Sequence, residues 1–121
     1  MANTDIMIDL ETLATSPDAA ILTIGAVKFD PFGRELTDPE MDSFYVRVDL
    51  DSCDEINLVT NDDTIAWWAN QTPEAKYEAF ENPDRMHIRE AMDKLYKFCW
   101  GAQRVWSNGS GFDIVICELI F

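Results

Sequence analysis

Asp5–Thr12, with the sequence DIMIDLET, is the stretch that decides the fold. Its apolar residues alternate with acidic residues and a methionine, and a period of two is that of a β-strand, whose successive side chains point to opposite faces of a sheet. Asp9 and Glu11 therefore lie on the same face of the predicted strand. Two neighbouring carboxylates repel each other unless a proton or a cation lies between them. The stretch thus predicts a strand that carries a candidate metal site.

Two further stretches predict strands that follow the first along the chain. Residues 20–29 are apolar on both faces for most of their length, as in a strand inside a sheet that is covered on two sides. Residues 43–50 alternate cleanly between apolar and polar positions. The DPFG sequence at 30–33 has the composition of a turn. Short connections of this kind favour an antiparallel meander with the carboxylate strand first.

The middle of the chain predicts a loop and then short helices. Residues 51–63 are polar and acidic and predict the loop, after which Asp63 or Thr64 is expected to cap a helix that runs through Ala69. A second helix is expected to begin at the Thr72-Pro73 pair, because proline is tolerated in the first turn of a helix. These helices separate the meander from the last third of the chain.

The last third predicts a helix, a strand and another helix. The first helix ends at Gly101 and carries one buried stripe at helical spacing, formed by Ile88, Ala91, Met92, Leu95, Phe98 and Cys99. Residues 104–106 predict a short strand, and a glycine-containing turn at 107–111 leads into a helix that starts near Asp113. A carboxylate at the start of a helix is favoured by the helix dipole. If this strand lies beside the first one, Asp113 reaches the same sheet edge as the carboxylate pair.

Three carboxylates, Asp9, Glu11 and Asp113, would then converge at that edge. Oxygen ligands of this kind suit Mg²⁺ or Mn²⁺, which prefer carboxylates and water and are usually shared with substrate phosphates. Two such ions about 3.5–4 Å apart activate a water molecule and stabilise the leaving oxygen of a phosphodiester. The alternatives are a solvated strand face for the pair and an ordinary helix-start acid for Asp113.

The same residues resemble a known family. Residues 8–12 (IDLET), followed by 20–27 (AILTIGAV), look like the first motif and second strand of the DEDD 3′-to-5′ exonucleases of the ribonuclease H-like superfamily. Residues 106–109 (WSNG) leading into Phe112 and Asp113 are similar to the second motif. Residues 64–71 (TIAWWANQ) resemble phage and bacterial exoribonucleases related to exonuclease VIII-like proteins. The resemblance covers nearly the whole chain, and both motifs together are far more specific than the first alone.

The resemblance implies a single α/β domain of ribonuclease H-like type over residues 1–121, with an antiparallel three-strand meander, a parallel fourth strand and packed helices. It implies metal-dependent hydrolysis of DNA or RNA from the 3′ end to nucleoside monophosphates. By the family's logic Asp9 bridges two Mg²⁺ or Mn²⁺ ions, Glu11 helps hold the ion that binds the attacking water, and Asp113 supports the other. The residues that we predict to contact the substrate are Thr12, Trp67, Trp68, Asn108 and Phe112. Large aromatic residues usually serve burial, so at least one of the tryptophans is expected to pack in the core.

The sequence ends at Phe121, inside an apolar segment without a capping residue, before the family's third motif. That motif supplies a His or Tyr general base and a fourth carboxylate on a last helix. We therefore expect a truncated domain that lacks its last strand and helix and is impaired in catalysis. The competing hypothesis is a non-catalytic remnant that binds nucleic acid or protein and self-associates as a homodimer through its exposed sheet edge. A phosphatase or sugar hydrolase built on the carboxylate pair explains neither the turn at 107–111 nor the tryptophans.

Composition narrows the class of protein further. Nine basic against 23 acidic residues give a net charge of −14, which argues against binding nucleic acid by general phosphate attraction. The charge does not exclude a nuclease, because carboxylate-bound Mg²⁺ supplies positive charge locally. No apolar run approaches the roughly 18 residues that span a bilayer, and the N-terminus has no secretory pattern. Three cysteines without CxxC spacing fit a reducing compartment, so a cytoplasmic protein without membrane association is expected.

Overall fold

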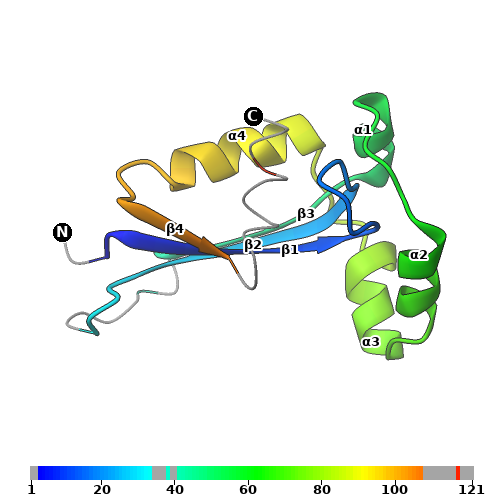
Figure 1. Ribbon diagram of the computed structural model, residues 1–121, viewed down its shortest axis with the longest axis horizontal. Coiled ribbons are helices and arrows are strands. Elements are labelled where there is room, and N and C mark those ends of the chain that lie inside the picture. The colour runs from blue at the N-terminus through cyan, green and yellow to red at the C-terminus, as the bar shows by residue number, and fades with distance from the viewer. Residues whose placement is uncertain (1–2, 34–37, 39–40, 108–116, 118–121) are drawn as a thin grey trace.

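A four-stranded mixed sheet is the centre of the computed structural model, which describes residues 3–33, 38, 41–107 and 117 (Figure 1). Its strands are β1 (Asp5–Thr12), β2 (Ile21–Phe29), β3 (Ser43–Arg47) and β4 (Arg104–Ser107). The spatial order is β3–β2–β1–β4. β2 pairs antiparallel with both β1 and β3, whereas β4 runs parallel to β1. The predicted meander with a parallel fourth strand, and with it the α/β fold class, is confirmed.

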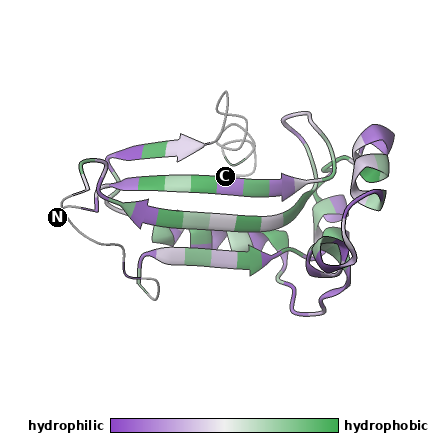
Figure 2. Ribbon diagram, turned by 90° about the horizontal axis from the view of Figure 1, so that it is seen from below, coloured by the Kyte–Doolittle hydropathy of each residue, from purple (hydrophilic) through white to green (hydrophobic). Residues whose placement is uncertain are grey.

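The helices lie on both sides of this sheet. They are α1 (Leu50–Glu55), α2 (Asp62–Ala69), α3 (Pro73–Lys76), which continues as a π-helical segment η1 (Tyr77–Glu81), and α4 (Ile88–Phe98). α4 runs along one face of the sheet, and α2 and α3 lie beyond the end of β1 towards the other face (Figure 1). Figure 2, which views the sheet from below, shows the strands in front of α4. We call the face turned away from α4 the open face.

The hydrophobic core lies between the sheet and α4. The stripe predicted from the sequence is buried on α4 at Ile88, Ala91, Met92 and Leu95. It packs with the apolar residues that alternate along β1 and β2, namely Ile6, Ile8, Leu10, Ile24 and Ala26. Burying one such aliphatic side chain contributes about 1.5–3 kcal/mol. The alternation in β1 therefore fixes which face is buried and turns Asp9 and Glu11 towards the open face.

The third strand is shorter than the sequence predicts. The expectation of a strand over 43–50 is wrong at its end, because β3 stops at Arg47 and α1 begins at Leu50. The side chain of Asp49 accepts a hydrogen bond from the backbone N–H of Asp51 at 3.1 Å, which caps α1. A capping aspartate competes with strand pairing. The loop expected over 51–63 is therefore interrupted by this short helix.

One helix start differs from the prediction and another agrees with it. α2 begins two or three residues earlier than expected, because its N-cap is Asn61 rather than Asp63 or Thr64. The Asn61 side chain accepts from the backbone N–H of Thr64 at 3.1 Å. The start of α3 is confirmed, with the Thr72 hydroxyl accepting from the backbone N–H of Ala75.

Arg85 fastens the end of η1 to the sheet. Its guanidinium donates to the backbone carbonyl oxygens of Ala79 and Asn82 at the end of η1, and to that of Val48 just after β3 at 2.9 Å. These contacts satisfy carbonyls that a helix leaves unpaired at its C-terminus. The segment α2–α3–η1 is thereby held at one end of the sheet.

No helix in the described part of the chain is long and apolar enough to cross a bilayer.

Candidate active site

Asp9 and Glu11 are exposed on the open face near the end of β1. The register of β1 against β2 shifts between Glu11 and Thr12, so the strand has a bulge immediately after the pair. Bulges at strand ends redirect side chains and are common beside active sites. Neither carboxylate takes part in a hydrogen bond or ion pair with another part of the chain that the structure describes. The predicted pair thus lies on one face without a countercharge among those residues.

The environment of Glu11 disfavours its charged form. Partial burial raises the pKa of its carboxyl group above the ordinary value, and the charges of Asp9 and then of Glu78 raise it further. A group in this state gains most from a cation, because a nearby positive charge relieves both the lost hydration and the repulsion. The electrostatics of the pair are those expected of a site that accepts a divalent ion.

A pocket of about 700 Å³ opens beside the pair. Asp9, Glu11 and Thr12 from β1 line one side. The other side is formed by the loop after β1 and by the start and inner face of α2, with Ala14, Thr15, Asn61, Asp63, Thr64, Trp67 and Trp68. Five residues predicted from the sequence, Asp9, Glu11, Thr12, Trp67 and Trp68, therefore line the same pocket. A volume of this size is in the usual range for small-molecule and nucleotide sites.

The two tryptophans have different roles in the pocket. Trp68 is only 6% exposed, and its indole N–H donates to the backbone carbonyl of Thr12 at 3.1 Å. Its ring packs edge-on against Phe80 of η1 and against Trp67, with centroid distances of 5.6 and 5.1 Å. Trp67 is 56% exposed. Trp68 is thus the tryptophan expected to pack in the core and joins α2 to the end of β1, while Trp67 lines the same pocket with an exposed ring.

Sequence reasoning missed the residues that place α2 beside the carboxylates. The backbone N–H of Asn61 donates to the carbonyl of Leu13 at 2.8 Å, which ties the start of α2 to the chain just after β1. Asn61, Asp63 and Thr64 also line the pocket. The available signal was the Asn-Asp-Asp-Thr run at 61–64, which contains several good capping residues and hides which one is the cap.

Three predicted site residues, Asn108, Phe112 and Asp113, lie outside the described residues. Within the described residues, no three Asp, Glu, His or Cys side chains are grouped closely enough to hold a metal ion. Asp9 and Glu11 supply two hard oxygen ligands, and such ligands fit Mg²⁺ or Mn²⁺ rather than a soft metal. The described pair is chemically suited to a divalent ion, for which it offers two carboxylate groups.

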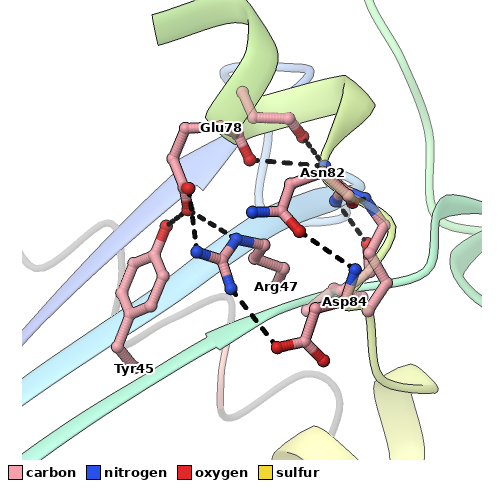
Figure 3. Close-up of polar contacts among 8 residues, drawn as sticks. Tyr45, Arg47, Glu78, Asn82 and Asp84 are labelled. Atoms are coloured by element: carbon pink, nitrogen blue, oxygen red, sulfur yellow. Dashed lines mark hydrogen bonds and ion pairs between the residues drawn. The ribbon is translucent and has the colours of Figure 1, made fainter. Parts of the chain in front are cut away.

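A second polar cluster lies on the open face at the end of β3 (Figure 3). Arg47 faces both carboxylate oxygens of Glu78, with Nη2–Oε1 at 2.8 Å and Nε–Oε2 at 2.6 Å, and lies 3.7 Å from Asp84. The Tyr45 hydroxyl donates to Glu78 at 2.5 Å. Arg47 lowers the pKa of Glu78, while burial and then Glu78 raise the pKa of Tyr45 to about 12. The cluster joins η1 to β3 with the carboxylate charged and the phenol neutral.

The first acidic residue of β1, Asp5, lies in a different environment. Asp5 is fully buried and accepts hydrogen bonds from the Arg104 Nε at 2.9 Å, the Trp106 indole N–H at 2.7 Å and the Thr4 hydroxyl at 2.8 Å. The hydrogen bond from Arg104 contributes most to lowering the pKa of Asp5 to about 2. Because Arg104 and Trp106 belong to β4, this carboxylate fastens the parallel strand to β1.

Comparison with known proteins places these features in a family. Residues 4–121 match the family described as the 3′-5′ exoribonuclease Rv2179c-like domain. The chain is also similar to the exodeoxyribonuclease of Enterobacteria phage T4, with 29% identity over 127 aligned residues that cover 96% of this chain and 55% of that protein. The chain thus spans about half the length of the curated relative that it matches. It belongs to the 3′-5′ exoribonuclease Rv2179c-like domain family.

Proposed function

We propose that this chain hydrolyses nucleic acid from the 3′ end in a metal-dependent reaction and releases nucleoside 5′-monophosphates. The observation that carries the proposal is the carboxylate pair Asp9 and Glu11, which has no countercharge among the described residues. The pair lies at the edge of a pocket walled by Trp67 and Trp68. The chain also belongs to a 3′-5′ exonuclease family. The pocket accommodates one terminal nucleotide, and the carboxylates lie where its phosphodiester would be bound.

The described residues of the pocket would bind metal ions and position the terminal nucleotide. Asp9 and Glu11 bind Mg²⁺ or Mn²⁺, which when bound supplies the Lewis-acid chemistry that phosphodiester hydrolysis requires. Trp67 stacks on the terminal base, since an aromatic face accepts any base. Trp68 holds Thr12 and excludes water from the inner wall through its buried ring. The ions bring the positive charge that a chain of net charge −14 otherwise lacks at this place.

Three residues are assigned on the sequence motif alone. We assign Asp113 as a third metal ligand, and Asn108 and Phe112 as substrate contacts. These assignments rest on the similarity of residues 106–113 to the second exonuclease motif. β4 supports them in part, because it lies parallel to β1 and ends at Ser107, directly before Asn108 in the sequence.

Experiment distinguishes RNA from DNA as the substrate. The family is described as exoribonuclease, whereas the phage T4 relative is named an exodeoxyribonuclease. The test uses the purified chain with 5′-labelled single-stranded RNA and DNA of the same sequence, in Mg²⁺ or Mn²⁺. A ladder that shortens from the 3′ end, with release of monophosphates, supports the proposal.

Two controls separate this activity from a contaminating nuclease. Asp9→Asn should abolish the ladder, whereas Asp93→Asn, which removes an exposed carboxylate on α4 that pairs with Lys97, should leave it unchanged. If the wild-type chain produces no ladder with either nucleic acid and either ion, or if Asp9→Asn remains active, the proposed function is wrong.

A further inference from the structure

Gly25 leaves a bare position on the open face beside the carboxylate pair. It pairs with Asp9 on β1 and with Tyr45 on β3, so the three residues form one row across the sheet. A Cβ atom added at Gly25 would lie 3.7 Å from the Asp9 backbone oxygen and 3.9 Å from Cδ1 of Tyr45, which are ordinary contact distances. Its φ angle is not among the positive values that favour glycine. Neither packing nor backbone conformation therefore requires a glycine here.

A glycine inside a strand weakens the strand and often marks a place where a ligand approaches the backbone closely. Adjacent strands are about 4.8 Å apart, so the Tyr45 position lies two strand spacings from Asp9 along this row. Whatever extends from the Asp9 end of the row towards β3 passes over Gly25 and meets the Tyr45 ring. The row is thus continuous with the candidate active site.

Tyr45 is held in place and still exposed. Its side chain is 51% accessible, although its hydroxyl is fixed by the hydrogen bond to Glu78 and the Arg47 guanidinium lies 5.3 Å from its ring centroid (Figure 3). Fixing a ring in advance reduces the entropy that a ligand would otherwise lose by ordering it. An exposed aromatic ring that is ordered by a charged cluster beneath it is suited to stacking.

The charges of this region favour stacking over phosphate attraction. Arg47 is paired with Glu78 and Asp84, Arg104 is paired with Asp5, and Arg85 donates to backbone carbonyls. These arginines already have partners, and the chain carries a net charge of −14. Base stacking on aromatic rings tolerates any sequence, because every base has a π-face.

We propose that Tyr45 is a stacking platform for the base that precedes the 3′-terminal nucleotide, and that the substrate strand crosses β2 over Gly25 to reach it. This inference rests on the proposed function, because it places the terminal nucleotide in the pocket walled by Trp67. The ligand is a single strand of at least two nucleotides. Arg47 and Glu78 act as positioning residues that orient the Tyr45 ring.

The test compares binding of a short strand with binding of its terminal unit alone. Fluorescence anisotropy measures the affinity of a 5′-labelled single-stranded trinucleotide in Ca²⁺, and competition measures that of the nucleoside 5′-monophosphate. Tyr45→Leu should weaken trinucleotide binding by about 5- to 150-fold, the range for losing one stacked base, with less than about a twofold effect on the monophosphate. Tyr45→Phe keeps the ring but loses the hydrogen bond to Glu78, so its affinity should lie between those of the wild type and Tyr45→Leu. Tyr96→Leu replaces a tyrosine on α4 that is similarly exposed and should change neither value.

Gly25→Ala provides a second variant that is expected to fold. The added methyl group meets no atom closer than 3.7 Å, so the midpoint of thermal unfolding should stay the same or rise. The methyl group fills the bare position, and trinucleotide affinity should fall by about fivefold or more, as for overpacking at a contact. Affinity for the trinucleotide should also depend only weakly on salt, because few phosphates are neutralised by side chains.

The inference is overturned if Tyr45→Leu leaves trinucleotide affinity unchanged, if it weakens the monophosphate equally, or if the wild-type chain binds the trinucleotide no better than the monophosphate. Hydrolysis is measured separately. A chain that binds the trinucleotide through Tyr45 but releases no monophosphate in Mg²⁺ or Mn²⁺ supports the inference and contradicts the proposed function. If the wild-type chain hydrolyses RNA or DNA and Tyr45→Leu binds the trinucleotide unchanged, the proposed function is supported and the inference about Tyr45 is contradicted.

Discussion

The two ends of β1 carry the same kind of side chain in opposite environments. Asp5 at the start is fully buried, accepts three hydrogen bonds and has its pKa lowered to about 2. Glu11 at the end has no such partner among the described residues, and its pKa is raised by burial, Asp9 and Glu78. All three acids of β1 alternate onto one face, so the strand pattern alone does not distinguish them. The difference shows that the fold pairs one carboxylate with Arg104 and gives the other two no partner among the described residues.

The unpaired carboxylates at the end of β1 have a physical cost. Two carboxylates that repel each other destabilise the folded state, and a protein usually retains such a pair only where it serves a purpose. Asp5 instead contributes to stability, because its partners on β4 complete the sheet. Substitution of Asp5 should therefore lower the stability of the fold, whereas substitution of Glu11 should raise it and reduce activity.

The largest expected effect is on catalysis. Asp9→Asn or Glu11→Gln should lower kcat/KM for 3′-end hydrolysis by at least about a hundredfold, because each removes a metal ligand that stabilises developing charge. Release of labelled monophosphate measures the loss, and circular dichroism confirms that the variants fold. Activity within about threefold of wild type in both variants would contradict a catalytic role for Asp9 and Glu11.

A smaller effect is expected on folding from the other end of the strand. Asp5→Asn should lower the midpoint of thermal unfolding by about 5 °C or more, because Arg104 and Trp106 then face a neutral side chain in a buried position. Differential scanning calorimetry measures the midpoint. An unchanged midpoint would show that β4 is held without this carboxylate.

Glu11→Gln should act in the opposite direction on folding in metal-free buffer. Removing one of two repelling charges should raise the unfolding midpoint by about 2–5 °C. Addition of Mg²⁺ or Mn²⁺ should raise the midpoint of the wild-type chain and have little effect on the variant. A midpoint that falls on substitution, or an equal response to the ions, would contradict the assigned repulsion.

The smallest expected effect is the pH dependence, and its sign differs between the two ends. The pKa of Asp5 is lowered from 3.8 to about 2, so its contribution to the free energy of unfolding is present above pH 4 and is lost as pH falls towards 2. The pKa of Glu11 is raised above 4.5, so its penalty is present at neutral pH and is relieved as pH falls through the raised value towards 4.5. Urea unfolding at several pH values measures both contributions. Asp5→Asn should lack the first dependence of the free energy of unfolding on pH, and Glu11→Gln should lack the second.

The sequence predicts the parts of the molecule that depend on local pattern. Alternation in residues 5–12 places Asp9 and Glu11 on one face, and helical spacing identifies the buried side of α4. The sequence does not predict α1, because the residues that fix it are paired far along the chain. The Ser52 hydroxyl accepts from the backbone N–H of Ile88, and the Cys53 thiol donates to the carbonyl of Ile21.

The candidate site likewise combines features that the local sequence pattern predicts with features that depend on contacts distant in the sequence. Its carboxylates and tryptophans are visible as motifs, whereas Asp5 resembles them in the sequence and is distinguished only by partners about a hundred residues away. Tyr45 and Gly25 belong to the site's surroundings only through strand register, which the alternation of one strand does not specify. Register and long-range hydrogen bonds are therefore what the structure adds.

Direct binding of a divalent ion tests the central claim that the end of β1 is a metal site and its start is not. Isothermal titration calorimetry of the purified chain with Mn²⁺ should show binding that Glu11→Gln weakens by about tenfold or more. Asp93→Asn, which alters an exposed carboxylate on α4, should bind as the wild type does. Equal Mn²⁺ affinity in wild type and Glu11→Gln, or no binding by the wild-type chain, would contradict the account.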